Sequence, residues 1–594
     1  MNYYYQFLNR PISLLLAKLV KYKRFREASN YFNNMNTEEG LYKDILEGSV
    51  AVEYMEEMRS AFETKRETLP ANCVMSNHLL SEFYDGAKLF DNRQSNFHAL
   101  IIQLLTLPPT YRVKNGCGSF VISTHNIGAG SIAERTMIYK FFVEDLKLLK
   151  EGFVKEIDGI SYFIQGRLNN HLWDTIAFAA NACVKVNNAK EECIVCGGIH
   201  GIYRHSLHHC YYMGHRRCLP INNRLRWYGT SRRCCPLGYY SGDAATEAEV
   251  NRLFVSTNTD DFPQRPRTAT YCNYHPGQTV GCDNPSRQLE ISMRETEYYV
   301  KVGTSIQFAK GNSNNQWFHE KEYPFDATGF HQYLSYPHLD LRKELEISHI
   351  TNEEFNERGV QALIHGGSYR GVHKPWPFKD LTKWNHVTFE SFHALKNVCD
   401  NIIALLKGKA GATSYPSRKL CKAEGVHPCL WSPNIKSIPL WQLSDREMAK
   451  ADAIMATVRI PFGYKGTSQI YNPFRQTGNL TGMQLITLVT TYLSLLVTFS
   501  SIHNEYKVFI SMLSSVLNDL MAPRITDEDV SWISNRIYEL VALKEGLFPD
   551  SEAKIVWHQL TDLPDSIHLF GPILCWWALP GEREIGSLKR FLYA

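Results

Sequence analysis

Acidic and cysteine residues occur close together at one point of the chain. Asp174 follows a strand-like run from Ile160 to Leu172, and Cys193 and Cys196 form a Cys-x-x-Cys pair shortly afterwards. Carboxylates bind the divalent cations that assist phosphoryl transfer, and paired cysteines bind zinc. This stretch therefore predicts two kinds of metal chemistry, and the rest of the chain should supply further carboxylates and further metal ligands.

A second aspartate stands in a similar position. Asp85 ends a predicted strand and precedes a turn at Gly86. Further along, the pattern predicts a helix over 97–107, a strand over 117–124 and an amphipathic helix over 131–151. This order indicates a mixed α/β core, with Asp85 and Asp174 near the ends of two strands, where their carboxylates can converge.

The cysteines are clustered. The chain has 15 Cys, nine of them between Cys183 and Cys282, and no secretory signal pattern at Met1. An odd number of clustered cysteines among histidines favours metal over disulfides. Two purely local zinc sites remain open. One would join Cys193 and Cys196 to His200, His205, His208 or Cys210. The other would use Cys234, Cys235, Cys272, His275 and Cys282.

A basic stretch overlaps this region. From Cys193 to Gly242 there is no Asp, Glu or Lys, and tyrosines lie among the arginines. The arginines are Arg204, Arg216, Arg217, Arg224, Arg226, Arg232 and Arg233. Such a block would contact nucleic-acid phosphates, and its tyrosines could stack on unpaired bases. The alternative is a solvated basic face, because the net charge of +4 does not by itself imply a nucleic-acid partner.

The length of 594 residues exceeds one ordinary domain. We divide the chain into a helical collar (1–75), a first core part with both aspartates (76–190), a Cys/His/Arg-rich insertion (191–383) and a helical C-terminal region (384–594). The apolar run from Met483 to Phe499 contains Gln484 and several hydroxyl residues. We interpret it as a buried helix rather than a membrane span.

Several motifs together resemble the transposases of CACTA (En/Spm-type) DNA transposons. The first is Tyr84-Asp85-Gly86 with the later Leu107-Pro108-Pro109. The second is Cys193-x-x-Cys196 followed by Gly214-His215-Arg216-Arg217-x-Leu219-Pro220. The third is Phe570-Gly571-Pro572 with Pro580-x-Glu582-Arg583 and Leu588-Lys589. The similarity runs patchily from about Leu80 to Lys589, and no N-terminal finger is present.

The resemblance implies an RNase H-like catalytic core with a DDE triad, as in the catalytic subunit of the V(D)J recombinase. Carried onto this chain, the triad is Asp85, Asp174 and Glu582, which would bind Mg²⁺ or Mn²⁺. Two other acids compete for the last place: Glu390, where the family has Asp in an Asp-x-x-His motif, and Glu584.

The resemblance also implies one structural zinc site. Its ligands would be Cys193, Cys196, His558 and Asp562, although family members have His at the last position. The spacing of His558 and Asp562 would put both on one face of a helix. This zinc would clamp the C-terminal helices onto the core and bring Glu582 to the two aspartates.

The expected activity is that of a nuclear transposase that cleaves the ends of a transposon and transfers strands. Its partner would be double-stranded DNA, both at the ends and at the target, bound by a homodimer and without a membrane. The alternative is a domesticated, inactive derivative that serves as a DNA-binding or scaffold protein. The three retained acids favour the enzyme, whereas Asp562 and the missing finger favour the derivative.

Overall fold

The computed structural model describes residues 7–88, 96–113, 117–126, 132–185, 349–408, 441–461, 469–476, 480–502, 504–548 and 552–593, with short described stretches between 193 and 347. Its framework is a mixed sheet with the strand order β1-β5-β4-β3-β7-β6. β3 (Val74–Lys88) and β7 (Ile160–Trp173) are parallel, and all other neighbours in this sheet pair antiparallel. The other strands are β1 (Phe7–Asn9), β4 (Asn96–Leu104), β5 (Ser119–Asn126) and β6 (Phe153–Ile157).

The predicted helix over 97–107 is wrong, because most of this stretch is strand β4. β4 pairs with β3 on one side and β5 on the other. Ile101 belongs to the core on one face of the sheet, and Leu100 and Ile102 belong to the core on the other. A central strand that is buried on both faces has the same continuous apolar sequence as a buried helix, so the pattern could not separate them. The strands predicted over 117–124 and 160–172 are confirmed as β5 and β7.

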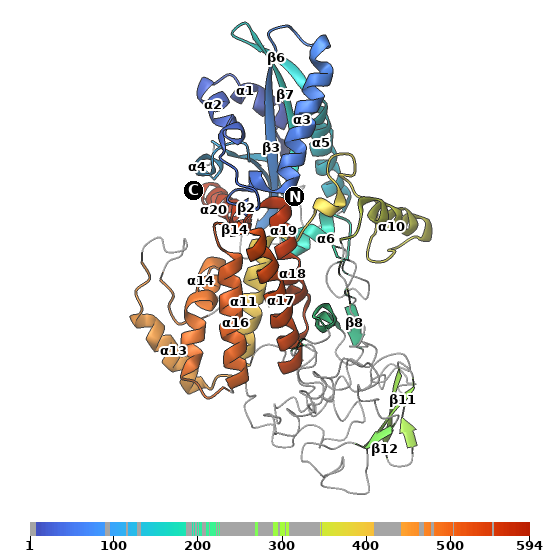
Figure 1. Cartoon of the computed structure of the whole chain (residues 1–594), viewed down its shortest axis with the longest axis vertical. Helices are drawn as coiled ribbons and strands as arrows, with labels where there is room; N and C mark the ends of the chain where they lie inside the picture. The colour runs from blue at the N-terminus through green and yellow to red at the C-terminus, as the bar shows by residue number, and fades with distance from the viewer. Residues whose placement is uncertain are drawn as a thin grey trace, which may run out of the picture.

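Helices cover both faces of the sheet, as a mixed α/β protein requires (Figure 1). On one face, α1 (Ile12–Leu19) and α5 (Ile132–Glu151) contribute Leu15, Leu16 and Phe142 to the core. On the other face, α3 (Ser49–Lys65) packs against the sheet together with C-terminal helices. The remaining helices of this half are α2 (Lys23–Ser29), α4 (Pro109–Arg112) and α6 (Thr175–Asn181).

The C-terminal region is helical, as predicted. Its helices are α11 (Ser391–Leu406), α13 (Asp445–Thr457), α14 (Gly482–Thr487), α15 (Ser494–Thr498), α16 (Asn504–Leu520), α17 (Asp527–Leu547), α18 (Ile555–Thr561), α19 (Leu563–Phe570) and α20 (Leu579–Tyr593). A π-helical stretch, Leu488–Leu493, joins α14 to α15, so the apolar run is indeed a helix that contributes to the core. Among the described helices, none has both the length and the hydrophobicity that crossing a membrane requires.

The two halves of the chain are joined at several points. β2 (Leu41–Tyr42) pairs with β14 (Ile525–Thr526), and a Cβ added at Gly48 would lie 2.3 Å from the backbone oxygen of Leu569. Such a close backbone approach fixes α19 against the start of α3. The helices that lead to Glu582 are therefore anchored on the sheet that carries Asp85.

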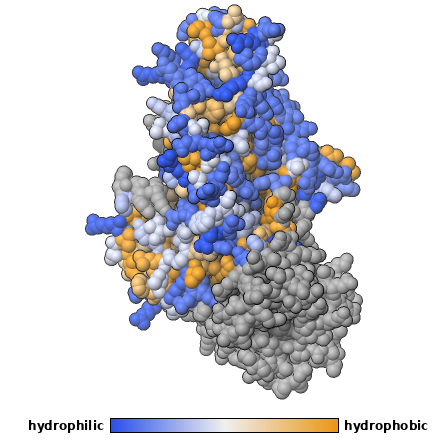
Figure 2. Space-filling view, in the orientation of Figure 1, coloured by the Kyte–Doolittle hydropathy of each residue, from blue (hydrophilic) through white to orange (hydrophobic). Residues whose placement is uncertain are grey.

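Part of the predicted insertion packs on the sheet. The segment from Ile350 to Leu381 shares a hydrophobic core with α5, and α10 (Asn352–His365) projects from it (Figure 1). The exposed side chains of Val360, Leu363 and Ile364 give α10 a hydrophobic tip (Figure 2). The other described elements of the insertion are β8 (Gly201–Arg204), β9 (His209–Tyr212), the 3-10 turn η4 (His215–Cys218), β10 (Thr268–Thr270), β11 (Leu289–Arg294), β12 (Glu297–Val302) and β13 (Ser305–Gln307).

Candidate active site and metal centre

Asp85 and Asp174 occupy equivalent places on two neighbouring parallel strands. Tyr84 of β3 pairs with Trp173 of β7, and each aspartate is the next residue along its chain. The predicted strand end at Asp85 and turn at Gly86 are wrong, because β3 continues to Lys88 and this last part still pairs with β4. Side chains alternate between the faces of a sheet, so Asp85 continues the face of Phe83, and Asp174 that of Leu172. Both of these apolar residues belong to the core beneath α3 and the C-terminal helices. The two carboxylates therefore lie next to each other on one face of the sheet, where the parallel pairing of β3 and β7 ends.

Glu582 reaches the same place from the far end of the chain. It lies in the first turn of α20, which packs on β3. A Cβ added at the preceding Gly581 would lie 2.4 Å from Cδ1 of Phe83, so only glycine permits this close approach. Burial raises the pKa of Asp85 to about 7, and the charges of Glu582 and Asp174 contribute to that rise. Glu582 and Asp174 are thus both within electrostatic reach of Asp85, but the three acids do not form a group like that of Cys193, Cys196 and His558, the one set of described residues whose ligand atoms all lie within 4.8 Å of one another.

Asp174 also begins α6. Its Oδ1 accepts a hydrogen bond of 2.6 Å from the backbone N–H of Ala177, which is the usual role of an N-cap aspartate. This bond fixes the carboxylate where β7 ends. Similarly, Asp85 Oδ1 accepts a hydrogen bond of 2.6 Å from the backbone N–H of Gly86. In each aspartate, one carboxylate oxygen accepts a hydrogen bond from a nearby backbone N–H, and the other oxygen could bind a metal ion.

A histidine that sequence reasoning did not assign links Glu582 to the protein behind it. His393 Nε2 lies 3.3 Å from Glu582 Oε1, and His393 Nδ1 lies 2.7 Å from Glu390 Oε2. Burial opposes the charged form of His393, but its hydrogen bonds with Glu390 and Glu582 outweigh burial and raise its pKa to about 10. His393 is therefore a cation at neutral pH, and it holds Glu582 from the side.

The two alternative acids have structural partners instead. Glu390 is buried, and its oxygens accept hydrogen bonds from the backbone N–H groups of Phe392, His393 and Ala578 as well as from the His393 ring. Glu584 is buried and accepts a hydrogen bond from Ser119 Oγ on β5. Glu582 is the C-terminal acid whose charge acts on Asp85.

A buried polar network lies on the other face of the sheet, among residues of the core that includes Tyr139 and Trp173. Glu82 on β3 is 0% exposed and accepts hydrogen bonds from Tyr139 Oη at 2.7 Å and Trp173 Nε1 at 3.1 Å. Its other oxygen lies 2.7 Å from His171 Nδ1. A buried carboxylate needs such donors, and together they tie β3, β7 and α5 at the level of the site. The sequence carried no signal for this network, because its members are far apart along the chain.

The second site is a cluster of Cys193, Cys196 and His558. Their ligand atoms all lie within 4.8 Å of one another, and all three side chains are buried. Cys193 and Cys196 lie in a short loop, here called the knuckle, that is closed by a hydrogen bond of 2.8 Å from the backbone N–H of Cys193 to the backbone oxygen of Ile199. Burial raises the pKa of the Cys193 thiol well above its ordinary value, so a thiolate here needs a cation beside it. The cluster could hold a metal ion such as zinc.

The His558 ring is oriented by a chain of hydrogen bonds. His558 Nε2 lies 3.3 Å from Cys196 Sγ, and its Nδ1 lies 3.1 Å from Nε2 of His215. His215 Nδ1 in turn lies 2.8 Å from Oε1 of the buried Glu545, and burial lowers the pKa of His215. Burial favours the neutral His558 ring, but the charges of Cys196 and Asp562 outweigh burial and raise its pKa to about 9. If Glu545 accepts from His215 and His215 accepts from His558 Nδ1–H, a metal that displaces the other proton would find the lone pair of His558 Nε2 facing Cys196. Carboxylate–histidine partners of this kind orient metal ligands.

This chain of contacts gives a structural role to part of the Gly214-His215-Arg216-Arg217 motif. Glu545 also accepts hydrogen bonds from the backbone N–H groups of Gly214 and His215. Arg216, predicted to contact DNA, is 0% exposed, and its Nε lies 3.7 Å from Glu545 Oε2. That prediction is corrected for Arg216, because a buried guanidinium does not reach phosphates. Arg217 is half-buried in the same turn.

Several predicted residues fall wholly or partly outside the described residues. Arg224, Arg226, Arg232 and Arg233 lie outside them, and only the backbone of Arg204 is described, in β8. Of the local zinc alternatives, His200, His205, His208, Cys234, Cys235, Cys272, His275 and Cys282 lie outside them, and Cys210 is described only as part of β9. Among the described residues, Cys193 and Cys196 cluster with His558, which is far from them in the sequence.

Asp562 and His349 are both within electrostatic reach of this cluster, but neither belongs to the group whose ligand atoms all lie within 4.8 Å of one another. Asp562 is buried, and its Oδ2 has no hydrogen-bond partner among the described residues. α18 ends at Thr561 and α19 begins at Leu563, so Asp562 lies between two helices rather than on one helix with His558. Asp562 is the C-cap of α18 and keeps helical φ and ψ angles, and its charge acts on both Cys193 and His558, so its assignment as a ligand stays a prediction.

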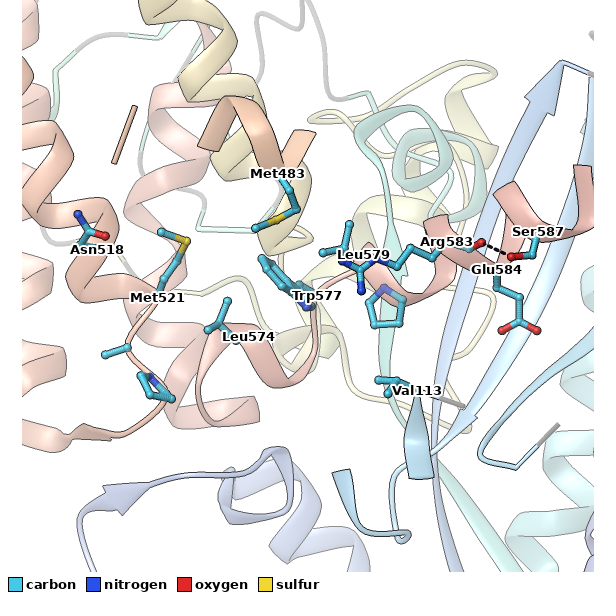
Figure 3. A pocket seen from close by; sticks show the side chains of 13 residues that line it. Val113, Met483, Asn518, Met521, Leu574, Trp577, Leu579, Arg583, Glu584 and Ser587 are labelled. Atoms are coloured by element: carbon cyan, nitrogen blue, oxygen red, sulfur yellow. Dashed lines mark hydrogen bonds between the residues drawn. The ribbon is translucent and has the colours of Figure 1, made fainter. Parts of the chain in front are cut away.

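A pocket of about 630 Å³ lies between α20, α14 and the end of α16 (Figure 3). Its walls are mainly apolar and include Met483, Met521 and Trp577. From α20 it is lined by Leu579, Pro580, Arg583, Glu584 and Ser587. None of the three predicted acids lines it, so it is separate from them.

Comparison with known proteins does not assign the chain. No protein-family model matches it, and no curated protein matches it. The interpretation of both sites therefore depends on the geometry of this chain's own residues.

Proposed function

We propose that the chain is a DNA transposase of the CACTA type, a divalent-metal-dependent endonuclease and strand-transferase built on an RNase H-like core. The observation that supports the proposal is that Asp85 lies within electrostatic reach of both Glu582 and Asp174, which come from distant parts of the chain. Burial and the charges of the other two acids raise the pKa of Asp85. Such a concentration of carboxylates is unfavourable unless cations compensate it.

The three carboxylates suit oxygen-preferring cations. Bound there, two Mg²⁺ or Mn²⁺ ions about 3.5–4 Å apart would stabilise the attacking and leaving oxygens of a phosphodiester. Asp85 and Asp174 would hold them from near the strand ends, and Glu582 would hold them from α20. His393 would keep Glu582 in place, and Glu390 would keep His393 in place.

The fold suits this role. The proposal requires a mixed sheet with acids near the carboxyl ends of two parallel strands, helices on both faces and a late helix that delivers the third acid. β3, β7 and α20 meet these requirements. Gly581 and Phe83 set the distance between α20 and β3.

A structural zinc ion would stabilise the arrangement. Cys193 and Cys196 follow β7 and α6, whereas His558 comes from α18, which precedes α20. A zinc ion held by all three would fasten the C-terminal helices to the core. The ion would act on structure, because no predicted catalytic acid belongs to the cluster.

The substrate would be double-stranded DNA, bound in the nucleus by a homodimer that bridges two transposon ends. The arginines of the basic stretch other than Arg216 would contact its phosphates. The alternative is an inactive derivative that binds DNA with the same surface. Activity separates the two proposals.

The test is metal-dependent nicking of supercoiled plasmid DNA. Wild-type protein should nick in Mg²⁺ or Mn²⁺ and not in EDTA, and Asp85→Ala, Asp174→Ala and Glu582→Gln should each lower the rate by at least about a hundredfold. The matched control is Glu528→Gln, which removes an exposed acid from the first turn of α17 and should leave the rate unchanged. Nicking that survives Asp85→Ala would contradict the enzymatic proposal, and DNA binding without any nicking would favour the inactive derivative.

A further inference from the structure

The metal cluster has three close donors, whereas structural zinc sites have four. Asp562, the fourth ligand expected from the resemblance, follows a tightened last turn of α18. Its backbone N–H bonds to the oxygen of Gln559, three residues earlier, at 3.3 Å. Such a 3-10 turn rotates Asp562 away from the regular helical position four residues after His558.

His349 is next to a residue that is hydrogen-bonded to the Cys193–Cys196 loop. The backbone N–H of Ile350 donates a hydrogen bond of 3.0 Å to the oxygen of Val195, which lies between the two cysteines. This bond holds the neighbouring His349 against the knuckle. The charges of Asp562 and Cys196 both act on the His349 ring, which places it within electrostatic reach of the cluster.

The two ring nitrogens of His349 have different surroundings. Nε2 lies 3.7 Å from Oδ2 of Asp565, in the first turn of α19. Nδ1 is buried and has no hydrogen-bond partner among the described residues. A histidine that binds a metal usually donates its other ring N–H to a carboxylate. The Asp565 carboxylate thus lies beside Nε2 at ion-pair distance, longer than a hydrogen bond, and Nδ1 is the nitrogen that faces no hydrogen-bond partner among the described residues.

The net charge of the zinc site also favours histidine over aspartate as the fourth ligand. Zinc with two thiolates and two neutral imidazoles is neutral overall, whereas a carboxylate in place of one imidazole leaves a net negative charge. The cluster is buried, and an uncompensated charge in such surroundings is costly. Asp562 lies in the same buried region and would bring that charge into direct contact with the thiolates.

We propose that His349 Nδ1 is the fourth zinc ligand, completing a Cys₂His₂ site with Cys193, Cys196 and His558. Asp565 lies beside the other nitrogen of His349, and Asp562 remains outside the coordination sphere. The inference rests on the proposed zinc ion and does not depend on the proposed DNA chemistry. The zinc ion would then connect α18 to both ends of the long stretch between Cys196 and His349.

The direct test is X-ray absorption spectroscopy of the full chain purified with zinc. Imidazole rings give a characteristic multiple-scattering signal, so the number of histidine ligands can be counted. We expect two sulfur and two imidazole ligands in the wild type. A single imidazole would overturn the proposal while leaving a zinc centre in place, and protein without zinc would contradict the metal centre itself.

Variants test the same assignment through zinc affinity, measured by competition with a chromophoric chelator. His349→Ala should lower the affinity by roughly tenfold or more, and Asp562→Asn should leave it within a few-fold. The matched control is His365→Ala, which removes an exposed histidine from α10.

A replacement ligand guards against a variant that simply fails to fold. His349→Cys should retain zinc and raise the number of sulfur ligands from two to three. Zinc that is lost in Asp562→Asn but kept in His349→Ala would overturn the proposal in favour of Asp562.

Discussion

His393 Nε2 lies 3.3 Å from Glu582 Oε1, so the last acid of the candidate site is held by a histidine that a second buried acid, Glu390, holds in turn. Glu390 also accepts hydrogen bonds from the start of α11 and from Ala578, just before α20. One buried carboxylate thus positions both the helix that carries His393 and the helix that carries Glu582. The Glu-x-x-His motif is a positioning device, and Glu582 remains the proposed metal ligand.

Replacing His393 should weaken metal use without affecting DNA binding. In His393→Gln, Glu582 loses a cationic partner, so we expect the nicking rate to fall by roughly 10–100-fold at limiting Mn²⁺ and to recover partly at high Mn²⁺. Nicking is measured over a Mn²⁺ titration, and DNA affinity by fluorescence anisotropy. The exposed His365→Gln serves as control. A His393→Gln protein with an unchanged Mn²⁺ dependence would show that the contact has no positioning role.

Gly581 should set the position of Glu582. A methyl group at this position would meet the ring of Phe83 at 2.4 Å, and Phe83 is itself buried. Gly581→Ala should therefore displace α20 from β3, cost roughly 1–3 kcal/mol of unfolding free energy and abolish most nicking. Gly586→Ala on the same helix meets nothing within 4 Å and is the matched control. The double variant Gly581→Ala with Phe83→Leu should regain activity, and equal activity of Gly581→Ala and wild type would contradict the expectation.

Removing one acid should stabilise the metal-free protein. Asp85 has a pKa raised to about 7 by burial and by its carboxylate neighbours, above the value near 3.9 in an unfolded chain. The folded state therefore binds more protons between these values, so the contribution of Asp85 to stability falls as pH rises through this window. At pH 8 without divalent metal, Asp85→Asn should raise the Tm, and at pH 4 it should not. Added Mn²⁺ should raise the Tm of the wild type more than that of Asp85→Asn. An Asp85→Asn protein less stable than wild type at pH 8 in EDTA would contradict the proposed crowding of charge.

Acid should destabilise the sheet through a different residue. His78 on β3 is 0% exposed, and burial lowers its pKa to about 4, below the value near 6.5 in an unfolded chain. The unfolded state therefore binds more protons between about pH 4 and 6.5, so the contribution of His78 is full above pH 6.5 and is lost towards pH 4. His78→Gln should reduce the acid loss of unfolding free energy by roughly 3 kcal/mol over this window. Denaturant unfolding at several pH values measures it, and parallel pH profiles for both proteins would contradict the prediction.

The sequence predicted the two aspartates better than the elements between them. Asp174 follows a long strand with buried residues on both faces, and Asp85 lies near the end of another such strand, β3. This pattern is local. The β4 stretch was predicted as a helix because apolar residues that are buried on both faces of a sheet carry no two-residue period. Only its pairing with β3 and β5 decides its structure.

The contacts around the sites could not be predicted, because they depend on packing between distant residues. Glu545 holds His215 across more than 300 positions of the chain, and Glu390 reaches Ala578 across nearly 200. A buried arginine such as Arg216 has the same sequence appearance as a surface arginine that binds DNA. The resemblance predicted that Cys193 and Cys196 meet His558, and the structure confirms this cluster. The metal site shared by the three acids stays a prediction, and the structure adds the residues that surround each acid.

The most direct measurement of the central claim is cleavage of the protein backbone by iron bound in place of magnesium. Fe²⁺ with ascorbate and peroxide generates radicals that cut the chain beside the bound metal, and mass spectrometry locates the cuts. We predict cuts near Asp85, near Asp174 and near Glu582, all suppressed by excess Mg²⁺ and absent in Asp85→Ala. Cuts near the two aspartates without any near Glu582, or cuts that persist in Asp85→Ala, would contradict a metal site shared by all three acids.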